Sequence, residues 1–238
     1  MPDPLQVLLD VQAHDLAADQ LRHRRATLPE RLALAEQQAA MARLAVELDE
    51  LRRRLADLDR SQRRVEDEVA TLAAKGEAEN KRLYSGTVTS PRELQAMQED
   101  IDGLARRQRG LEDNVLEIME AGEPLREEVD RLESVREERA AEAARLGDVI
   151  AAGEAEIDAE LAVVLGERDG IAGDVPDDLL TTYERLRDRL GGVGVARLDG
   201  IQCTGCHLSL PATEVDAIRH ATPGNVVFHE ECGRILVR

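Results

Sequence analysis

Two short segments near the carboxyl end of the sequence have the residue types and spacing of metal ligands. They are Cys203-Thr-Gly-Cys206 and His229-Glu-Glu-Cys232. In each segment two residues separate the pair of donors, so each pair can bind one side of a tetrahedral ion. Thiolate and imidazole donors together favour zinc. Four protein donors leave no open position for a substrate water, so we expect a structural Zn²⁺ ion.

His207 is the competing candidate for the fourth ligand, because it directly follows Cys206. His229 is preferred, since its place in the second segment matches that of Cys203 in the first. A redox pair of cysteines would leave Cys232 and His229 unexplained, and an iron–sulfur cluster would normally need a fourth cysteine. In a reducing cytosol, clustered cysteines are metal ligands more often than disulfide partners.

The rest of the sequence offers no arrangement that could carry catalysis. It lacks a Ser/His/Asp order, a glycine-rich phosphate loop and a carboxylate pair in an expected pocket. We therefore expect neither an enzyme nor a small-molecule substrate. No apolar run reaches the length of a membrane helix, and the first residues lack the features of a signal peptide, which predicts a cytoplasmic protein without a membrane partner.

The composition indicates a mostly helical protein built around a coiled coil. Aromatic residues make up only 1% of the 238 residues and charged residues 34%, which is typical of long helices rather than of a large globular core. Apolar residues recur at alternating spacings of three and four from Met41 to Leu72, and again from Leu94 to Ile157. Glycine, serine and proline interrupt the pattern at 84–91. We therefore predict a first helix over 4–83 and a long antiparallel coiled-coil hairpin over 1–172.

Several finer expectations follow from the same pattern. The heptad register is expected to shift near residues 33–40, and Pro124 to kink the second helix near Gly122. Gln62 and Gln108 lie about equally far from the turn, where they could share a polar layer. The alternative is that the helices pair with another molecule in a parallel coil, but the turn would then serve no purpose.

A second, smaller domain is expected at 175–238. A linker at 170–176 leads to a short helix with one apolar face, and another helix is expected at 211–220. Three β-prone runs surround the metal ligands: Val193–Leu198, Val226–His229 and Ile235–Val237. A segment of about forty residues buries too little apolar surface to fold alone, so the metal must stabilise this zinc ribbon.

The turn at the end of the hairpin is the expected site for a protein partner, because Tyr84 and Val88 should be exposed there. The residues that we assign to this site are Tyr84, Ser85, Gly86, Thr87, Val88, Pro91 and Arg92. Transcription factors that insert an acidic coiled-coil tip into RNA polymerase use carboxylates to hold a metal ion. Here Glu93 is the nearest acid, so such catalysis is not expected, whereas docking on polymerase stays open.

The charge is unevenly distributed along the chain. The formal net charge is −18, and about −14 of it falls within residues 110–174. An acidic chain argues against nucleic-acid binding, but the near-neutral ribbon leaves it as an alternative that would use Arg197, Arg219, Arg234 or Arg238.

A basic belt is expected part-way along the hairpin. Five arginines lie at similar distances from the turn: Arg63, Arg64, Arg106, Arg107 and Arg109. The neighbouring acids Glu66, Asp67 and Glu68 favour an ordinary solvated face in which these charges are balanced.

The turn Leu83-Tyr-Ser-Gly-Thr-Val-Thr-Ser-Pro-Arg-Glu-Leu-Gln95 and the ending Cys232-Gly-Arg-Ile-Leu-Val-Arg238 resemble a bacterial family of coiled-coil hairpin proteins with a C4-type zinc ribbon. The resemblance covers the whole chain and implies a kinked hairpin with the ribbon at its open end. Cys203, Cys206 and Cys232 match the family's ligands, whereas His229 replaces the fourth cysteine. Relatives in flagellated or type III-secreting bacteria resemble adaptors for sigma-54 and export components, and one is linked to flagellin mRNA. For this chain, the resemblance implies an adaptor with protein partners.

Overall fold

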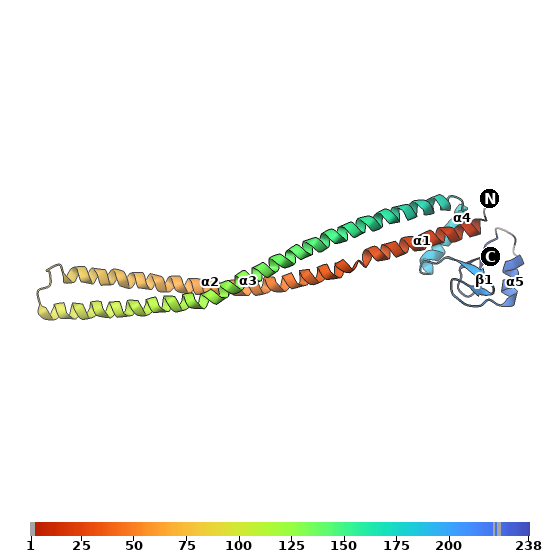
Figure 1. Ribbon diagram of the computed structural model, residues 1–238. Coiled ribbons are helices and arrows are strands. Elements are labelled where there is room, and N and C mark those ends of the chain that lie inside the picture. Colours follow the sequence, from red (N-terminus) through yellow and green to blue (C-terminus); the bar gives the residue numbers. More distant parts are fainter. Residues whose placement is uncertain (1–2, 221, 223–224) are drawn as a thin grey trace. The chain divides into compact units, whose positions relative to one another are not determined.

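Long helices make up most of the fold in the computed structural model, which describes residues 3–220, 222 and 225–238. The elements in chain order are α1 (Pro4–Ala26), α2 (Pro29–Leu83), α3 (Pro91–Ala172), α4 (Asp177–Arg189), β1 (Val195–Asp199), β2 (Gln202–Cys203), α5 (Ala212–His220), β3 (Val227–Phe228) and β4 (Ile235–Val237). The predicted fold class, a long helical hairpin with a small region of strands near the carboxyl end, is confirmed (Figure 1). The first two residues of the predicted hairpin lie outside the described residues.

The chain divides into two compact units. The first unit joins Met1–Ala33 to Leu146–Arg238, and the second is Leu34–Arg145. Both long helices therefore contribute to both units, whereas the boundaries predicted from sequence, 1–172 and 175–238, follow the ends of helices. Each unit is described separately below.

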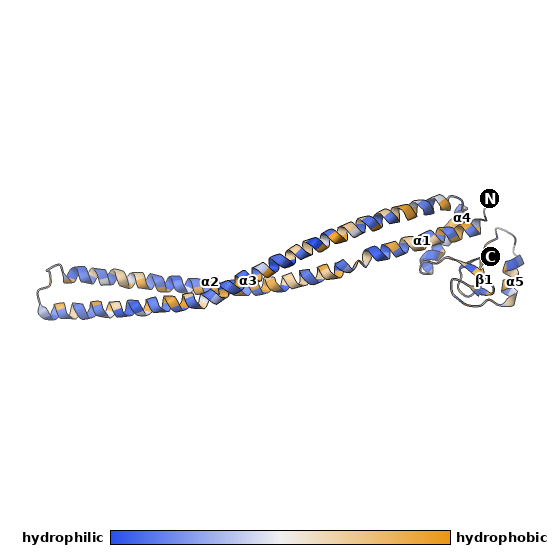
Figure 2. Ribbon diagram, in the orientation of Figure 1, coloured by the Kyte–Doolittle hydropathy of each residue, from blue (hydrophilic) through white to orange (hydrophobic). Residues whose placement is uncertain are grey.

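The second unit is an antiparallel pair of helices formed by parts of α2 and α3. Every position of the predicted apolar seams in this unit is buried or partly buried, with Leu48, Val65 and Leu72 among the most enclosed. Figure 2 shows the resulting alternation of hydrophilic and hydrophobic residues along both helices. Arg126 on α3 lies 3.4 Å from a carboxylate oxygen of Asp59 on α2. The helices therefore pair within the chain, and not as a parallel coil with another molecule.

The shared polar layer predicted for the two glutamines is wrong. Gln62 Nε2 donates to Glu66 over 2.7 Å, and Gln108 Nε2 donates to Glu112 over 2.8 Å. Each amide thus bonds a carboxylate one turn along its own helix, since positions four apart lie next to one another on a helix surface.

The prediction of a single first helix over residues 4–83 is also wrong, because the helix is interrupted between α1 and α2. Pro29 has no N–H to donate to the carbonyl of Arg25, and its ring would clash with that carbonyl. Arg31 Nε donates to this carbonyl instead, over 3.3 Å. At the end of α1, the backbone N–H and the side-chain hydroxyl of Thr27 both donate to the His23 carbonyl. The proline signal is local and was visible in the sequence.

Helix α3 continues from Pro91 to Ala172 with Pro124 inside it. The kink near Pro124 stays a prediction. No helix among the described residues has both the length and the apolarity needed to cross a membrane.

The first unit has a mixed sheet with the strand order β2-β1-β4-β3. Strand β1 is parallel to β4 and antiparallel to β2, and β3 is antiparallel to β4. The buried side chain of Gln12 on α1 extends the strand pairing: its Nε2 donates to the Val195 carbonyl and its Oε1 accepts from the Val195 N–H, each over 2.8 Å. This pair of bonds attaches α1 to the first strand of the ribbon.

A buried polar network joins α1, α3 and α4 in the first unit. Asp15 is 6% exposed and accepts a hydrogen bond of 2.7 Å from the hydroxyl of Tyr183, which is fully buried. Arg168 Nε donates to the other oxygen of Asp15 over 3.2 Å, and Arg187 Nε lies 3.7 Å from the first. Burial and the bond to Asp15 raise the pKa of Tyr183, so its hydroxyl remains a donor.

Candidate metal centre

The structure brings together the four donors that the sequence analysis preferred. Cys203 ends β2 and Cys206 lies in the turn after it, whereas His229 directly follows β3 and Cys232 lies in the next turn. One atom of each residue belongs to a cluster in which all donor atoms lie within 4.8 Å of one another. The two segments thus meet as a pair of facing loops in the first unit.

The geometry of this cluster fits one tetrahedral ion. His229 Nδ1 lies 3.0 Å from Cys232 Sγ and 3.4 Å from Cys206 Sγ. Donors around a zinc ion with ordinary bond lengths stand about 3.5–3.8 Å apart, so small shifts would seat the ion. Nδ1 is therefore the ring atom placed to bind. His207, the competing candidate, is exposed and has a φ of 62°.

Glycines allow the chain to turn tightly around the cluster. A Cβ atom on Gly205 would lie 2.6 Å from Cδ of Arg234 and 3.0 Å from Cβ of Ala196. Gly233 has a φ of 69°, and its N–H donates to the His229 carbonyl over 2.7 Å. The first turn thus needs a residue without a side chain for packing, and the second needs one for its backbone conformation.

Arg234 has a structural role at the site, whereas the sequence analysis named it only as a candidate contact for nucleic acid. Its Nε donates to the Val193 carbonyl over 3.0 Å, and its side chain packs against Gly205. It therefore connects the second ligand loop both to the first loop and to the segment after α4. Only its position directly after Cys232-Gly233 could have drawn attention to it.

The two cysteines at opposite sides of the cluster differ in acidity in the metal-free chain. Burial raises the pKa of the Cys203 thiol to about 11. Burial acts in the same direction on Cys232, but hydrogen bonds from Arg234 and His229 outweigh it and lower the pKa of that thiol to about 7. Cys232 is thus better prepared than Cys203 to bind a cation, since binding at Cys203 has to displace a proton.

The buried ring of His229 has a nitrogen without a hydrogen-bond partner in the described part of the chain, which costs free energy of folding. The residue is 1% exposed, and its Nε2 atom has no hydrogen-bond partner among the described residues. Ligating histidines normally donate this second N–H to an oxygen, and a buried N–H without a partner costs about 1–3 kcal/mol. Histidine is therefore a tolerated ligand at this position, and not the best one.

His229→Cys is expected to bind zinc at least as tightly as the natural chain and to raise the melting temperature of the ribbon. A thiolate would complete a four-cysteine site and remove the unpartnered N–H. The measurement is zinc affinity by competition with a chromophoric chelator, together with calorimetric melting. His207→Asn is the control, because asparagine tolerates a positive φ and residue 207 lies outside the cluster. A fall in affinity for His229→Cys alone would contradict the expectation.

The predicted partner site at the turn lies in the second unit. Tyr84 is 78% exposed, and Gly86 has a φ of 73° that suits glycine. Ser85 Oγ donates to the Arg82 carbonyl over 2.7 Å and lies 2.7 Å from the hydroxyl of Thr87. Pro91 begins α3, with Arg92 exposed beside it. Val88 was expected to be exposed and is only partly so.

The ribbon carries exposed apolar side chains that sequence reasoning did not single out. Ile201 is 56% exposed, Leu208 51% and Phe228 45%. Ile201 and Leu208 lie on either side of the first pair of ligands, and Phe228 directly precedes His229. β-Prone runs predict buried strands, so only the pairing of the strands reveals which of these side chains remain in contact with solvent.

Comparisons with known proteins agree with this architecture. Residues 11–191 match the CT398-like coiled coil hairpin domain, and residues 202–236 match the C4-type zinc ribbon domain. The uncharacterised protein Rv2229c of Mycobacterium tuberculosis is 33% identical over 97% of this chain and 94% of its own length.

Solved structures show the same fold. One from Mycobacterium smegmatis has a TM-score of 0.88 at 26% identity and covers 99% of this chain and 97% of its own. CT398 from Chlamydia trachomatis has a TM-score of 0.73 at 19% identity, with 98% and 96% covered. The HP0958 protein of Helicobacter pylori has a TM-score of 0.53 at 17% identity, again with 98% and 96% covered. The chain therefore belongs to the family of CT398-like coiled-coil hairpin proteins that carry a carboxy-terminal C4-type zinc ribbon.

Proposed function

We propose that this protein is a non-enzymatic, zinc-binding adaptor whose ribbon and hairpin turn bind separate macromolecular partners. A coiled-coil hairpin that carries a zinc ribbon has a binding or scaffolding role in general terms. The absence of catalysis is supported by the donor set, because three thiolates and an imidazole fill a tetrahedral shell and leave no position for a reacting water.

One observation carries the proposal: among the described residues the exposed aromatic side chains lie at two places in different compact units, and on the ribbon exposed aliphatic side chains accompany the aromatic one. Tyr84 marks the turn in the second unit, whereas Ile201, Leu208 and Phe228 lie on the ribbon in the first. Exposed aromatic and aliphatic side chains on well-ordered supports are typical of protein-binding surfaces. The chain has few aromatic residues. Exposing two of them gives up the stabilisation that burial of their large apolar area would provide.

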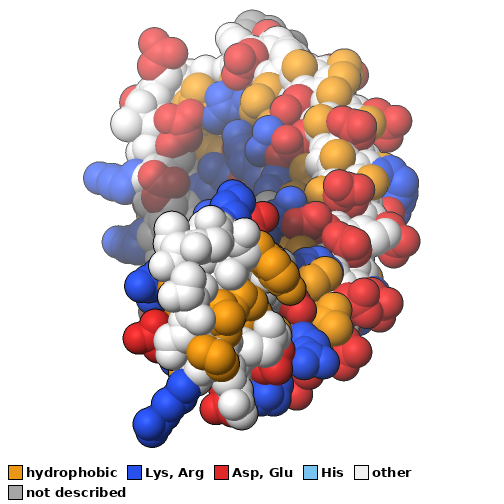
Figure 3. Space-filling model, turned by 90° about the vertical axis from the view of Figure 1, so that its left-hand side faces the viewer, with side chains coloured by type: hydrophobic (Ala, Val, Ile, Leu, Met, Phe, Trp, Pro, Cys, Tyr) orange, Lys and Arg blue, Asp and Glu red, His pale blue; other side chains and the backbone are white. Residues whose placement is uncertain are grey.

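The nucleic-acid alternative receives less support from the ribbon. Each of the four arginines that would contact phosphate already donates to an acceptor in the chain: Arg197 to Gln6, Arg219 to Gly200, Arg234 to Val193 and Arg238 to Arg219. Figure 3 looks from the side of the hairpin turn, where basic, acidic and apolar side chains are mixed as well. Phosphate binding normally uses a continuous basic surface.

Affinity purification after crosslinking in the native cell tests the proposal. Tyr84→Ala is expected to lose one set of crosslinked partners, and Ile201→Ser/Phe228→Ser to lose another, because each removes apolar area from one surface alone. Crosslinked peptides identified by mass spectrometry provide the measurement. Thr89→Ala in the turn and Thr213→Ala on α5 are the controls, since both side chains are exposed and neither belongs to the apolar surfaces.

Both variants must retain full helicity and zinc content for the comparison to hold. The adaptor proposal fails if neither variant changes the crosslinked partners. If partners are recovered only with RNA present, and are lost on nuclease treatment, the nucleic-acid alternative replaces it.

A further inference from the structure

A basic groove runs along one side of the helical pair in the second unit. It has a volume of about 750 Å³. The residues that line it are Arg60, Arg63, Arg64, Asp67, Glu68, Thr71, Leu72 and Lys75 on α2, and Arg107 and Leu111 on α3. Five cations and two acids give this groove a positive excess on a chain whose net charge is −18.

Most cations of this groove are left without an ion-pair partner. Within the described residues, Arg63, Arg64 and Lys75 have no carboxylate within 4.0 Å, and neither does Arg107; only Arg60 is paired, with Asp57. Elsewhere along the same helices, Arg52, Arg53, Arg54, Arg131 and Arg145 form ion pairs, whereas among the described residues Arg43, Arg106, Arg109 and Arg136 also have no carboxylate within 4.0 Å. These four cations therefore have no close acid partner in the described part of the chain, although Asp67 and Glu68 line the same groove.

The floor of the groove is apolar. Leu72 is 9% exposed and Leu111 is partly buried, and the two come from facing positions of the apolar seams. A groove between two packed helices with apolar residues along its floor is the surface on which a third helix packs. The basic residues lie along the rims, where they could pair with acidic side chains of such a helix.

The other side of the same helical pair has a different character. A smaller groove there, of about 400 Å³, is lined by Glu66, Val69, Ala70, Glu112, Val115 and Leu116. At 100° per residue, Glu66 and Ala70 fall on the opposite side of the seam from Arg64 and Lys75. Among the described residues, this smaller groove is lined by two acids and no cation, so the two grooves differ in charge.

We propose that the basic groove binds an acidic amphipathic helix of a protein partner. Apolar residues of that helix would lie on Leu72 and Leu111, and its carboxylates would pair with Arg63, Arg64 and Arg107. A nucleic acid fits less well, because no aromatic residue lines the groove to stack on a base. An apolar floor likewise contributes nothing to a phosphate backbone. This surface is distinct from both the turn and the ribbon.

Fluorescence anisotropy with the full chain tests the proposal. The probe is a labelled designed peptide of about four heptads, with leucine at positions a and d and glutamate at e and g. We expect Arg64→Glu/Arg107→Glu to weaken its binding at least about tenfold, since attraction becomes repulsion at two rim positions. Arg64→Gln/Arg107→Gln, which removes the charges without reversing them, should give an intermediate loss.

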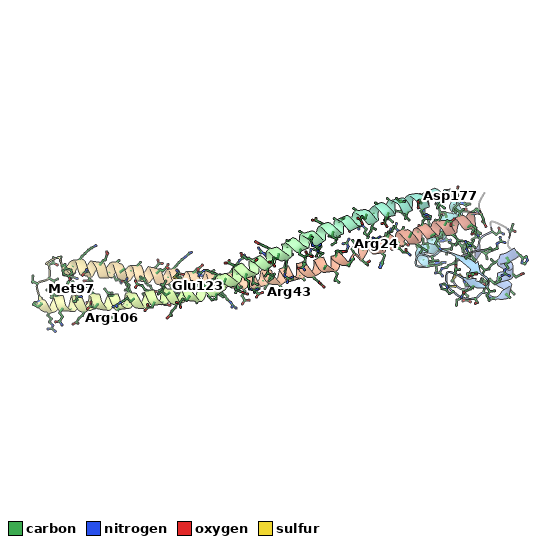
Figure 4. All side chains as sticks on the ribbon, in the orientation of Figure 1. Arg24, Arg43, Met97, Arg106, Glu123 and Asp177 are labelled. Atoms are coloured by element: carbon green, nitrogen blue, oxygen red, sulfur yellow. The ribbon has the colours of Figure 1, made fainter. Side chains whose placement is uncertain are left out.

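Arg106→Glu/Arg109→Glu is the matched control. It makes the same change in net charge at the same level of α3, where Arg106 is labelled in Figure 4, but neither residue lines the groove. Three outcomes overturn the proposal. The control variant could weaken binding as much as the groove variant, a peptide with lysine in place of glutamate could bind equally well, or the natural chain could fail to bind the peptide. Tighter binding of an RNA duplex that the same groove variant abolishes overturns it in favour of nucleic acid. The adaptor proposal is tested by crosslinks at the turn and the ribbon. A negative result in the anisotropy experiment therefore does not affect it.

Discussion

Cys203→Ala is expected to unfold the ribbon and leave the long helices intact. Cys203 is fully buried within a small cluster that includes Ala196, Val215 and Ile218, and the strands around it are two to five residues long. We therefore expect such a core to hold the loops only when the metal is bound. In zinc-finger peptides the ion contributes about 10–16 kcal/mol to folding at neutral pH, so the loss of one thiolate should remove most of the ribbon's stability.

Two measurements check this result. Zinc analysis of the purified chain should fall from one ion per chain to nearly none, and hydrogen exchange should become fast in β1, β4 and α5 while α2 and α3 remain protected. Treating the natural chain with a strong chelator should reproduce the same exchange pattern. His207→Asn should change neither readout. Full protection of the ribbon in the zinc-free Cys203→Ala chain would show that the metal is not structural.

Asp15→Ala is expected to destabilise the first unit by about 3–5 kcal/mol, the cost of breaking a buried ion pair by removing one partner. The substitution leaves the guanidinium groups of Arg168 and Arg187 without a shared anion. The hydroxyl of Tyr183 also loses its acceptor inside the protein, and an unsatisfied buried donor adds to the cost. Arg187 Nε already lacks a hydrogen-bond partner among the described residues. Arg168 keeps Glu184 and Asp169 as ion-pair partners and Arg187 keeps Asp19, which places the expected loss at the lower end of that range.

The free energy of unfolding, from urea titration followed by hydrogen exchange, provides the measurement. Asp10→Ala is the matched control, since Asp10 is on the same helix and is exposed. Tyr183→Phe should cost less than Asp15→Ala, because it removes one hydrogen bond and leaves both arginines paired. If Asp15→Ala and Asp10→Ala have equal stability, the network contributes no net stabilisation.

The coiled coil and the metal ligands were predictable because their signals are local. Heptad spacing and a proline-containing turn act over a few residues, and the two ligand pairs are each complete within four. The same locality explains why a single first helix was predicted. Pro29 interrupts the helix by removing one hydrogen bond, and the apolar spacing was followed only from Met41 onward, after this proline. The glutamine layer failed for the opposite reason, since a partner one turn away on the same helix is easier to reach than one across the pair.

Other features depend on residues that the sequence keeps far apart. Asp15 and Tyr183 are separated by 168 positions, and Gln12 and Val195 by 183. No periodicity relates such pairs, so only packing of α1 against α4 and the sheet reveals them. The basic groove likewise needs the register between α2 and α3, which decides that Arg107 lines it and Arg106 does not.

By itself the sequence determined a helical hairpin, its turn and a cluster of three cysteines with a nearby histidine, because hydrophobic spacing and donor spacing are properties of neighbouring residues. The tertiary structure decided that Nδ1 of His229 lies among the cysteine sulfur atoms and that His207 is exposed, since this depends on how β3 and β4 pair. It also decided which charges remain unpaired, because an ion pair requires two side chains to meet in space. The candidate surfaces for partners could therefore be identified only from the packed structure. The helices and strands that carry these surfaces could be predicted from the sequence.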